Sequence, residues 1–250
     1  IGCINLKSRE DKFLNMKKEF EKNNVNNVHF IQVDKHPLGG RIGCFDSHLQ
    51  LYRHCIKHNY EYALIFEDDV KINSENITNT LNKFFYIRNT YPLWYKVNCH
   101  NWGIIFIKKK VDESIYMANG MGNPCYFISS IAMEKALKQG ITFNHIDVQQ
   151  CFDFPSDLVF YINPPMSSIM ALGSDNDDYG TSIWGKMAFY LQDKTTYLQT
   201  IHHNLNLHFP MYTNFSKFFS YKQLYDEYKD KNKKTNIKIN NDAIVIMQDL

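Results

Sequence analysis

Three consecutive carboxylates end a short apolar run in the first third of the chain. The run at 63–66 is followed by Glu67, Asp68 and Asp69. Adjacent carboxylates at the end of a buried strand repel one another and lose hydration, so a cation is expected beside them. Hard oxygen ligands suit Mg²⁺ or Mn²⁺, which a diphosphate can share with the protein. The triplet therefore predicts a divalent-metal site for a nucleoside diphosphate, and acids that cap a helix or face solvent are the alternative.

The side chains of the triplet are expected to alternate in direction. Glu67 and Asp69 lie on one side of an extended chain and Asp68 lies on the other. The carboxylates of Glu67 and Asp69 can then converge on one ion.

Strand-like and helix-like segments alternate through the first two thirds of the chain and must position these acids. One helix is indicated by Phe13, Met16, Lys17 and Phe20 at helical spacing. Strands are expected at 1–6, 28–33, 63–66, 103–107 and 125–129, and helices at 8–24, from the 43–48 block to about 59, and at 131–139 before a glycine stop. This order favours an α/β sheet covered by helices, with ligands beyond the carboxyl ends of the strands. The acidic triplet falls at such an end.

Composition limits the classes of protein that the chain can belong to. Its 250 residues, 44% of them hydrophobic, can bury a substantial core. The net charge of +2 indicates no general attraction to nucleic acid or to a membrane surface. No apolar run approaches the ~20 residues of a membrane span, so no transmembrane segment is expected. The six cysteines include no Cys-x-x-Cys pair and are expected to be buried thiols.

Three short blocks carry a resemblance to a known enzyme family. They are Asn5-Leu6 with Ser8-Arg9, Gly43-Cys44-Phe45-Asp46-Ser47-His48, and Phe66-Glu67-Asp68-Asp69-Val70. In this order they resemble glycosyltransferase family 25, which includes bacterial lipooligosaccharide galactosyltransferases and the sugar transferases of collagen hydroxylysine. The resemblance covers about residues 1 to 175.

The resemblance implies a GT-A-like mixed sheet covered by helices, a UDP-sugar donor, a divalent cation and inversion at the anomeric carbon. Glu67, Asp68 and Asp69 take the place of the Asp-x-Asp-like donor motif. Asp69 would be the direct ligand of Mn²⁺ or Mg²⁺, and Glu67 is the further metal candidate. Glu67 or Asp68 would hold metal-bound water or the donor ribose.

Further donor contacts are expected beyond the first two strands and near the start of the second helix. The free N–H groups of a helix amino end suit a phosphate. Ser47 and His48 could bind donor oxygens; alternatively, Ser47 caps the helix and His48 packs behind the sheet. Asn5 and Arg9 could hold uridine, and Asp34 could accept from the base or ribose. The candidate donor-binding residues are Asn5, Leu6, Arg9, Asp34, Ser47, His48, Glu67 and Asp68.

An inverting transfer needs a base that takes a proton from the acceptor hydroxyl. The family pattern of a Tyr-x-x-Ser strand, a helix and a downstream Asp is matched by 126–129, 134–139 and Asp147. Asp147 is therefore the candidate catalytic base. The alternatives are that Asp147 caps the following segment or that His145 is the base.

The resemblance also divides the chain. Residues 1–175 are expected to form the GT-A-like core that binds the nucleotide sugar, and residues 176–250 a helical, aromatic-rich extension that completes the domain. The aromatic residues from Phe215 to Tyr228 recur at helical spacing, which is typical of a core. An acceptor-stacking surface and a homodimer contact are the alternatives.

The expected function is a metal-dependent, inverting transfer of a hexose, galactose or glucose, from a UDP-sugar to a hydroxyl acceptor. The acceptor would be a glycan or a hydroxylysine-containing protein. A catalytically inactive relative that binds a nucleotide sugar or glycan is the alternative. A nucleotidyltransferase is disfavoured, because residues 5–9 contain no glycine for a triphosphate-binding loop. The sequence leaves the compartment open.

Overall fold

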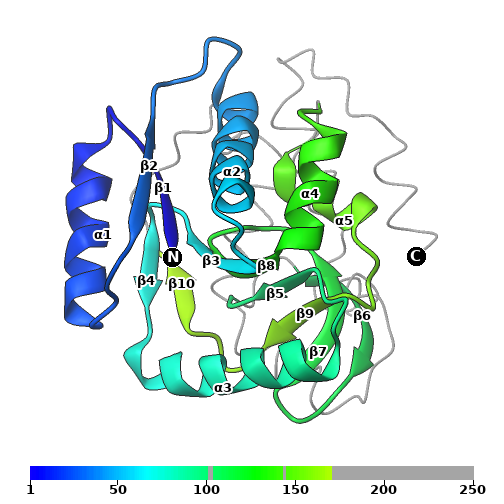
Figure 1. Cartoon of the computed structure of the whole chain (residues 1–250). Coiled ribbons are helices and arrows are strands. Elements are labelled where there is room, and N and C mark those ends of the chain that lie inside the picture. Colours follow the sequence, from blue (N-terminus) through cyan, green and yellow to red (C-terminus); the bar gives the residue numbers. More distant parts are fainter. Residues whose placement is uncertain (101–103, 143–144, 171–250) are drawn as a thin grey trace, which may run out of the picture.

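A computed structural model describes residues 1–100, 104–142 and 145–170 (Figure 1). The expected C-terminal extension and its boundary at 175 lie outside these residues. Within the described ranges, no helix combines the length and the apolar character needed to cross a membrane.

The first half of the chain forms three parallel strands connected by two helices. β1 pairs with β2 on one side and with β3 on the other. The elements are β1 (Gly2–Leu6), α1 (Glu10–Lys22), β2 (His29–Val33), α2 (Gly40–Lys57) and β3 (Tyr62–Phe66). The predicted alternation of strands and helices is confirmed here.

The second half extends the sheet with strands of both directions. β8 is antiparallel to β3 and to β5, whereas β5 and β9 are parallel. The strand order is β2-β1-β3-β8-β5-β9-β7-β6, so the predicted mixed sheet is confirmed. The added elements are α3 (Ser74–Thr90), β5 (Lys96–Asn98), β6 (Ile104–Lys110), β7 (Ile115–Gly120), β8 (Cys125–Ser129), α4 (Ser130–Gln139), α5 (Ile146–Asp153) and β9 (Val159–Ile162).

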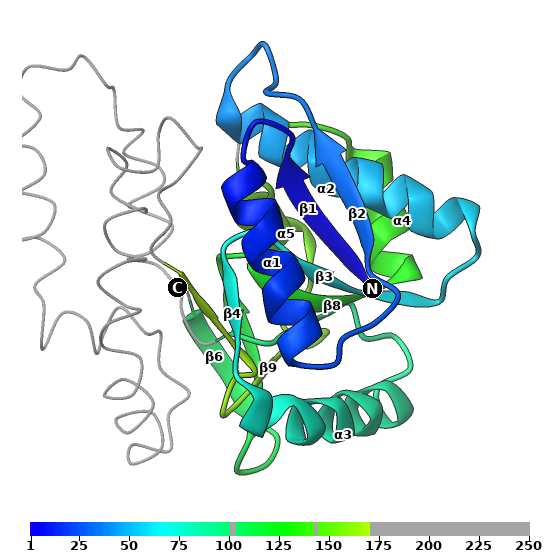
Figure 2. The same ribbon diagram turned by 90° about the vertical axis from the view of Figure 1, so that its left-hand side faces the viewer.

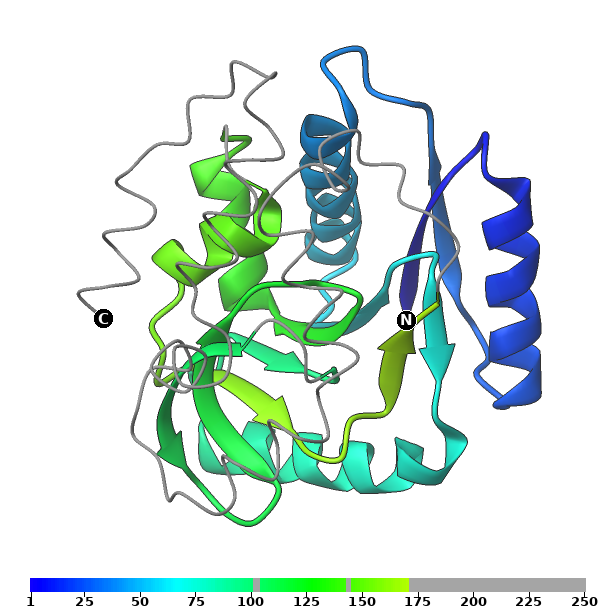
Figure 3. The same cartoon turned by 180° about the vertical axis from the view of Figure 1, so that it is seen from behind.

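A second, two-stranded sheet lies beside the acidic triplet. β4 (Val70–Ile72) pairs in antiparallel fashion with β10 (Ser167–Ile169), as seen from behind in Figure 3. The Met170 N–H continues this pairing by donating to the Asp69 carbonyl at 2.6 Å. The pair holds the chain immediately after the triplet.

Helices cover both faces of the large sheet, and side chains alternate between the two resulting cores. On β8, Tyr126 and Ile128 pack into the cluster that includes residues of α2 and α4, whereas Phe127 packs into the cluster that includes residues of α1 and α3. Figures 1 and 2 show α2 and α4 side by side on one face. The predicted covering of the sheet by helices is thus observed.

The inner face of α1 differs from the predicted one. Its buried residues are Lys12, Met16 and Phe20, four residues apart, while Lys17 is exposed. The apolar stripe therefore continues through a buried lysine, because Lys12 faces carboxylates at the end of the sheet.

The Gly43–His48 block lies inside α2 and does not begin it, in contrast to the prediction. The helix begins at Gly40, after Gly39 with φ +97°, and the Gly43 N–H already donates to the Gly39 carbonyl at 3.0 Å. The free N–H groups of the first turn thus precede the block. The predicted glycine stop is confirmed at Gly140, with φ +74°.

Candidate functional site

One cavity lies at the carboxyl ends of the parallel strands β1, β2 and β3, where the topology predicted a ligand. It brings together most of the predicted site residues. Those that line it are Asn5, Leu6, Ser47, His48, Glu67, Asp68, Asp69 and Asp147, together with His145.

The acidic triplet is not extended, because the chain turns at Asp68 and Asp69. The predicted alternation is therefore wrong, and all three side chains line the same cavity. Lys12, whose side chain is 3% exposed, places Nζ 3.3 Å from Asp68 Oδ1 and 3.9 Å from Asp69 Oδ2. A buried lysine thus supplies part of the positive charge that the triplet was expected to need.

Asn5 holds Asp68 from the end of β1. Its Nδ2 donates to Asp68 Oδ2 at 2.9 Å and to the Arg9 carbonyl at 3.2 Å. Burial raises the pKa of Asp68, while Lys12 and the Asn5 hydrogen bond act in the opposite direction. Asn5 is itself buried, so it orients this carboxylate.

Asp69 is the carboxylate with unused bonding capacity. Burial, followed by the Glu67 carboxylate, raises the pKa of Asp69 to about 7. Its Oδ1 is buried and has no hydrogen-bond partner among the described residues. A divalent cation bound there would satisfy this oxygen and stabilise the ionised form.

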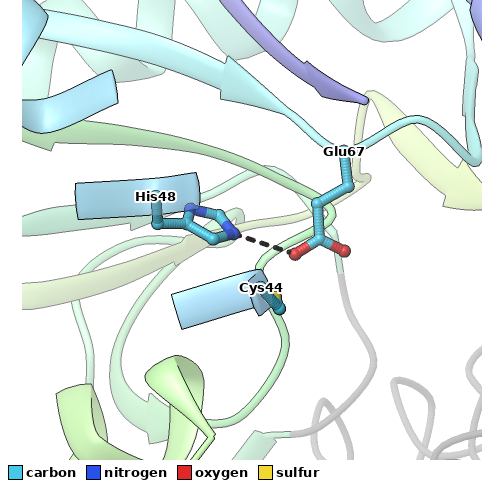
Figure 4. Close-up of side chains that lie close together, drawn as sticks. All are labelled: Cys44, His48 and Glu67. Carbon is cyan, nitrogen blue, oxygen red and sulfur yellow. Dashed lines mark hydrogen bonds and ion pairs between the residues drawn. The ribbon is translucent and has the colours of Figure 1, made fainter. Parts of the chain in front are cut away.

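Glu67 is held differently, by the imidazole of His48. His48 is fully buried on α2, and its Nε2 lies 3.2 Å from Glu67 Oε1 (Figure 4). The other ring nitrogen, Nδ1, lies 2.7 Å from the Tyr126 hydroxyl. Both nitrogens of His48 are thus engaged by protein groups, and the residue positions Glu67.

This hydrogen-bond chain continues across the core to α5. The Tyr126 and Tyr52 hydroxyls lie 2.7 Å apart, and Gln150 Nε2 donates to the Tyr52 hydroxyl at 2.9 Å. Because the Glu67 carboxylate only accepts, one direction satisfies every partner: His48 Nε2–H donates to Glu67, Tyr126 donates to His48 Nδ1, and Tyr52 donates to Tyr126 while it accepts from Gln150. The chain thus selects the Nε2–H tautomer and presents a donor to the carboxylate.

Asp147 faces the same cavity from the first turn of α5. Its Oδ2 accepts from the Gly122 N–H at 2.7 Å, and Oδ1 accepts from the Val148 N–H at 2.9 Å. The helix cap is His145, so the alternative that Asp147 caps α5 is wrong. Gly122 has φ +93°, a conformation that favours glycine, and this turn aims its N–H at Asp147.

A comparison with known families decides the assignment. The family described as glycosyltransferase family 25 (LPS biosynthesis protein) matches residues 3–151, more than half of the chain. The chain belongs to glycosyltransferase family 25. It is therefore a glycosyltransferase, as the three sequence blocks predicted.

Solved structures similar to this family 25 chain are remote in sequence. A glycosyltransferase involved in the glycosylation of the major capsid of PBCV-1 is 11% identical, with 70% of this chain and 94% of that chain covered and a TM-score of 0.45. Apo UDP-glucose pyrophosphorylase is 11% identical with a TM-score of 0.39, and the enzyme complexed with UDP-glucose is 12% identical with 0.40. Both cover 64% of this chain and 71% of their own. No curated protein matches the chain.

Two of the predicted donor residues of this family 25 chain pair with other side chains and lie outside the cavity. Arg9 pairs with Asp11 at 2.8 Å, and Asp34 is an exposed partner of Lys7 at 2.6 Å. Neither Arg9 nor Asp34, both in the described part of the chain, lines the cavity. Ser47 does line it, although its hydroxyl donates to the Gly43 carbonyl one turn earlier, at 2.6 Å.

Lys96 supports the site from outside the cavity, and the sequence patterns did not indicate it. It lies on β5, is 2% exposed, and donates from Nζ to the Gly122 carbonyl at 3.3 Å and to Asn123 Oδ1. Nζ also lies 4.9 Å from the centroid of the Tyr126 ring. Burial lowers the pKa of Lys96 to about 8. Lys96 thus supports, from inside, the turn that holds Asp147.

Proposed function

We propose that this glycosyltransferase moves a hexose, galactose or glucose, from a UDP-sugar to a hydroxyl group, with inversion and with the help of a divalent cation. The observation that carries the proposal is the shared cavity. It contains a carboxylate oxygen of Asp69 that has no partner in the part of the chain that the structure describes, and a second carboxylate, Asp147, held by a backbone N–H.

The residues present fit a Mn²⁺ or Mg²⁺ ion. Asp69 would be the direct ligand through its unpartnered oxygen, with Glu67 as the further candidate and Asp68 close by. All are hard oxygen donors, which these ions prefer. When bound, the ion would neutralise negative charge on the departing UDP.

The chain itself orients the donor. Asn5 fixes Asp68, and Lys12 keeps a positive charge at the edge where the diphosphate would lie. Asn5, Leu6 and Ser47 line the cavity and are the proposed donor contacts. Arg9 and Asp34 are left out of this site, because they lie outside the cavity.

Asp147 is the proposed catalytic base. Its carboxylate would take the proton of the acceptor hydroxyl as that oxygen attacks the anomeric carbon. The bond from the anomeric carbon to the UDP oxygen breaks as the new bond forms, and its electron pair leaves with UDP. The hydrogen bond from Gly122 N–H holds the carboxylate in place before the acceptor arrives.

The family also suggests the acceptor, which would be a hydroxyl of a glycan or of a hydroxylysine-containing protein. Residues 1–175 would form the core. Residues 176–250 would complete the domain and carry an acceptor or homodimer surface.

The test is the release of UDP from a panel of UDP-sugars in Mn²⁺ by the parent chain and by Asp69→Asn. Loss of several kcal/mol of charge stabilisation corresponds to a fall of about 100-fold or more. Asp157→Asn is the matched control, because Asp157 is a half-exposed partner of Lys108. Unchanged release by Asp69→Asn would reject the metal assignment. UDP-sugar binding without any release would identify an inactive nucleotide-sugar-binding relative.

A further inference from the structure

We propose that Cys44, His48 and Glu67 form a second cation site on the wall of this cavity, one that takes a softer divalent ion, Zn²⁺. Each residue offers one ligand atom, and these atoms lie within 4.8 Å of one another. Figure 4 shows Cys44 and His48 on α2 with Glu67 opposite them.

The ligand types distinguish this site from the one proposed at Asp69. A thiolate, an imidazole and a carboxylate are the three donor groups that zinc accepts in proteins. Mn²⁺ and Mg²⁺ favour carboxylate, carbonyl and water oxygens instead. The two sites share Glu67 and differ in every other ligand.

The backbone already places the ligands at the required spacing. Cys44 and His48 are four residues apart on α2, so their side chains lie on one face of the helix. His48 Nε2 and Glu67 Oε1 are 3.2 Å apart. Two ligands of a tetrahedral zinc ion, each bonded at about 2.0–2.1 Å, are separated by roughly 3.3 Å. The His48–Glu67 pair therefore needs little movement to chelate zinc.

The hydrogen-bond chain behind His48 can serve a bound metal. A metal-ligating histidine donates its other N–H to an acceptor, which here is the Tyr126 hydroxyl, 2.7 Å from Nδ1. Tyr126 would then donate to Tyr52, and Tyr52 would need an acceptor. Gln150 supplies one, because its buried Oε1 has no partner in the described ranges and the amide can turn over.

This reversal conserves protons along the chain. The imidazole keeps one N–H, which changes from Nε2 to Nδ1, and each tyrosine keeps its hydroxyl proton. The only proton released is that of the Cys44 thiol, because a thiolate is the metal ligand. Zinc binding therefore releases one proton per ion.

The three ligand residues border the cavity, and the Glu67 side chain is 30% exposed. Cys44, His48 and Glu67 all line the cavity, so an ion can reach them and retain a water molecule. Zinc would hold Glu67 within the proposed donor motif. Bound zinc is thus expected to compete with the UDP-sugar, an inhibition that goes beyond the proposed function.

The direct test is a titration of the full-length chain with Co²⁺, a spectroscopic substitute for Zn²⁺. A thiolate-to-cobalt charge-transfer band in the near ultraviolet, bleached by Zn²⁺, is expected in the parent and lost in Cys44→Ala. Cys55→Ala is the matched control and keeps the band, since Cys55 is buried on the same helix and does not line the cavity. Absence of the band, or its persistence in Cys44→Ala, would overturn the proposal.

Two further measurements do not depend on removing the cysteine. Zn²⁺ binding to the parent should change the ¹⁵N resonances of His48 from the Nε2–H to the Nδ1–H tautomer, with release of about one proton per ion. Tyr126→Phe, which removes the outer acceptor, should weaken Co²⁺ binding about 10- to 100-fold. An unchanged His48 tautomer in saturating Zn²⁺ contradicts the site. These readouts need no turnover, so failure of the transferase proposal would leave them standing.

Discussion

Two buried lysines support different parts of the cavity, and their hydrogen-bond and ion-pair partners differ. Each is 2% exposed. Lys12 faces a carboxylate, with Nζ 3.3 Å from Asp68 Oδ1. Lys96 donates to the carbonyl of Gly122 and to the amide oxygen of Asn123, and no carboxylate oxygen of the described residues lies within 4.0 Å of its Nζ. One lysine compensates charge, whereas the other holds a turn.

This difference separates two physical tasks. On the proposed donor side, Asp68 and Asp69 lie together and need positive charge, which Lys12 supplies in part. On the other side, the desolvation of the Lys96 ammonium outweighs the attraction of the Asp147 and Glu67 carboxylates, and its hydrogen bonds fix the turn that orients Asp147. The donor side is thus built for electrostatics and the Asp147 side for geometry.

The largest effect is expected for a substitution of Asp147. It should slow the chemical step and leave donor binding unchanged. Asp147→Asn keeps an acceptor oxygen for the Gly122 N–H but cannot take a proton. We expect kcat for transfer to fall about 100- to 10,000-fold, with donor affinity unchanged. Steady-state kinetics and calorimetry with a UDP-sugar measure the two quantities. Asp153→Asn at the end of the same helix is the control, and an equal loss of donor affinity in Asp147→Asn would contradict the separation.

The next effect is on stability at the donor side. Lys12→Met leaves Asp68 and Asp69 without their buried cation, so the free energy of unfolding should fall by roughly 3 kcal/mol. Mn²⁺ should restore more stability to this variant than to the parent, since it supplies the missing charge. Urea unfolding with and without Mn²⁺ measures both. Lys17→Met, at an exposed position of α1, should match the parent, and equal stability of Lys12→Met would show that the lysine compensates nothing.

The corresponding prediction for Lys96 is a pH dependence. Its pKa is lowered from 10.5 to about 8 in the folded chain, so the unfolded chain binds more protons between these values and stability rises with pH. The gain is absent below about pH 8, complete above 10.5, and at most on the order of 3 kcal/mol. Lys96→Met lacks this contribution. The unfolding free energy of the parent should therefore rise relative to that of Lys96→Met across the window, and a constant difference would refute the lowered pKa.

The same two lysines show what a sequence can reveal. Lys12 had a local signal, because it lies four residues before Met16 and eight before Phe20 on the buried stripe of α1. The spacing of Phe13, Met16 and Phe20 puts Lys17 on that stripe instead, but Lys17 is exposed. Lys96 had no such signal, because it lies in a three-residue strand whose surroundings come from distant segments.

The fold likewise has one part that the sequence patterns predict and one part that they do not. Apolar runs and helical spacing predicted β1 to β3 and the helices between them, because β1 and β3 are largely buried and β2 still carries Phe30, Ile31 and Val33. The strands β5, β7 and β9 are defined by pairing with one another and with β8, which no local pattern records. At the site, the acidic triplet was predicted from a sequence pattern, and Asp147 was predicted from the family resemblance. The bonds from His48 to Tyr126 and from Asp147 to Gly122 span 78 and 25 residues and required the structure.

The smallest effect is expected at Tyr52, in the hydrogen-bond chain that runs from Gln150 through Tyr126 and His48 to Glu67. Tyr52→Phe removes the hydroxyl between Tyr126 and Gln150, so the free energy of unfolding should fall by about 1 kcal/mol. Tyr126 can still donate to His48 Nδ1, and the Nε2–H that faces Glu67 is retained. The KM for the UDP-sugar should therefore change by less than about tenfold. Tyr60→Phe, at a half-exposed position, is the control for urea unfolding and kinetics. A large rise in KM would show that Tyr52 sets the orientation of Glu67, and that geometry governs the donor side as well.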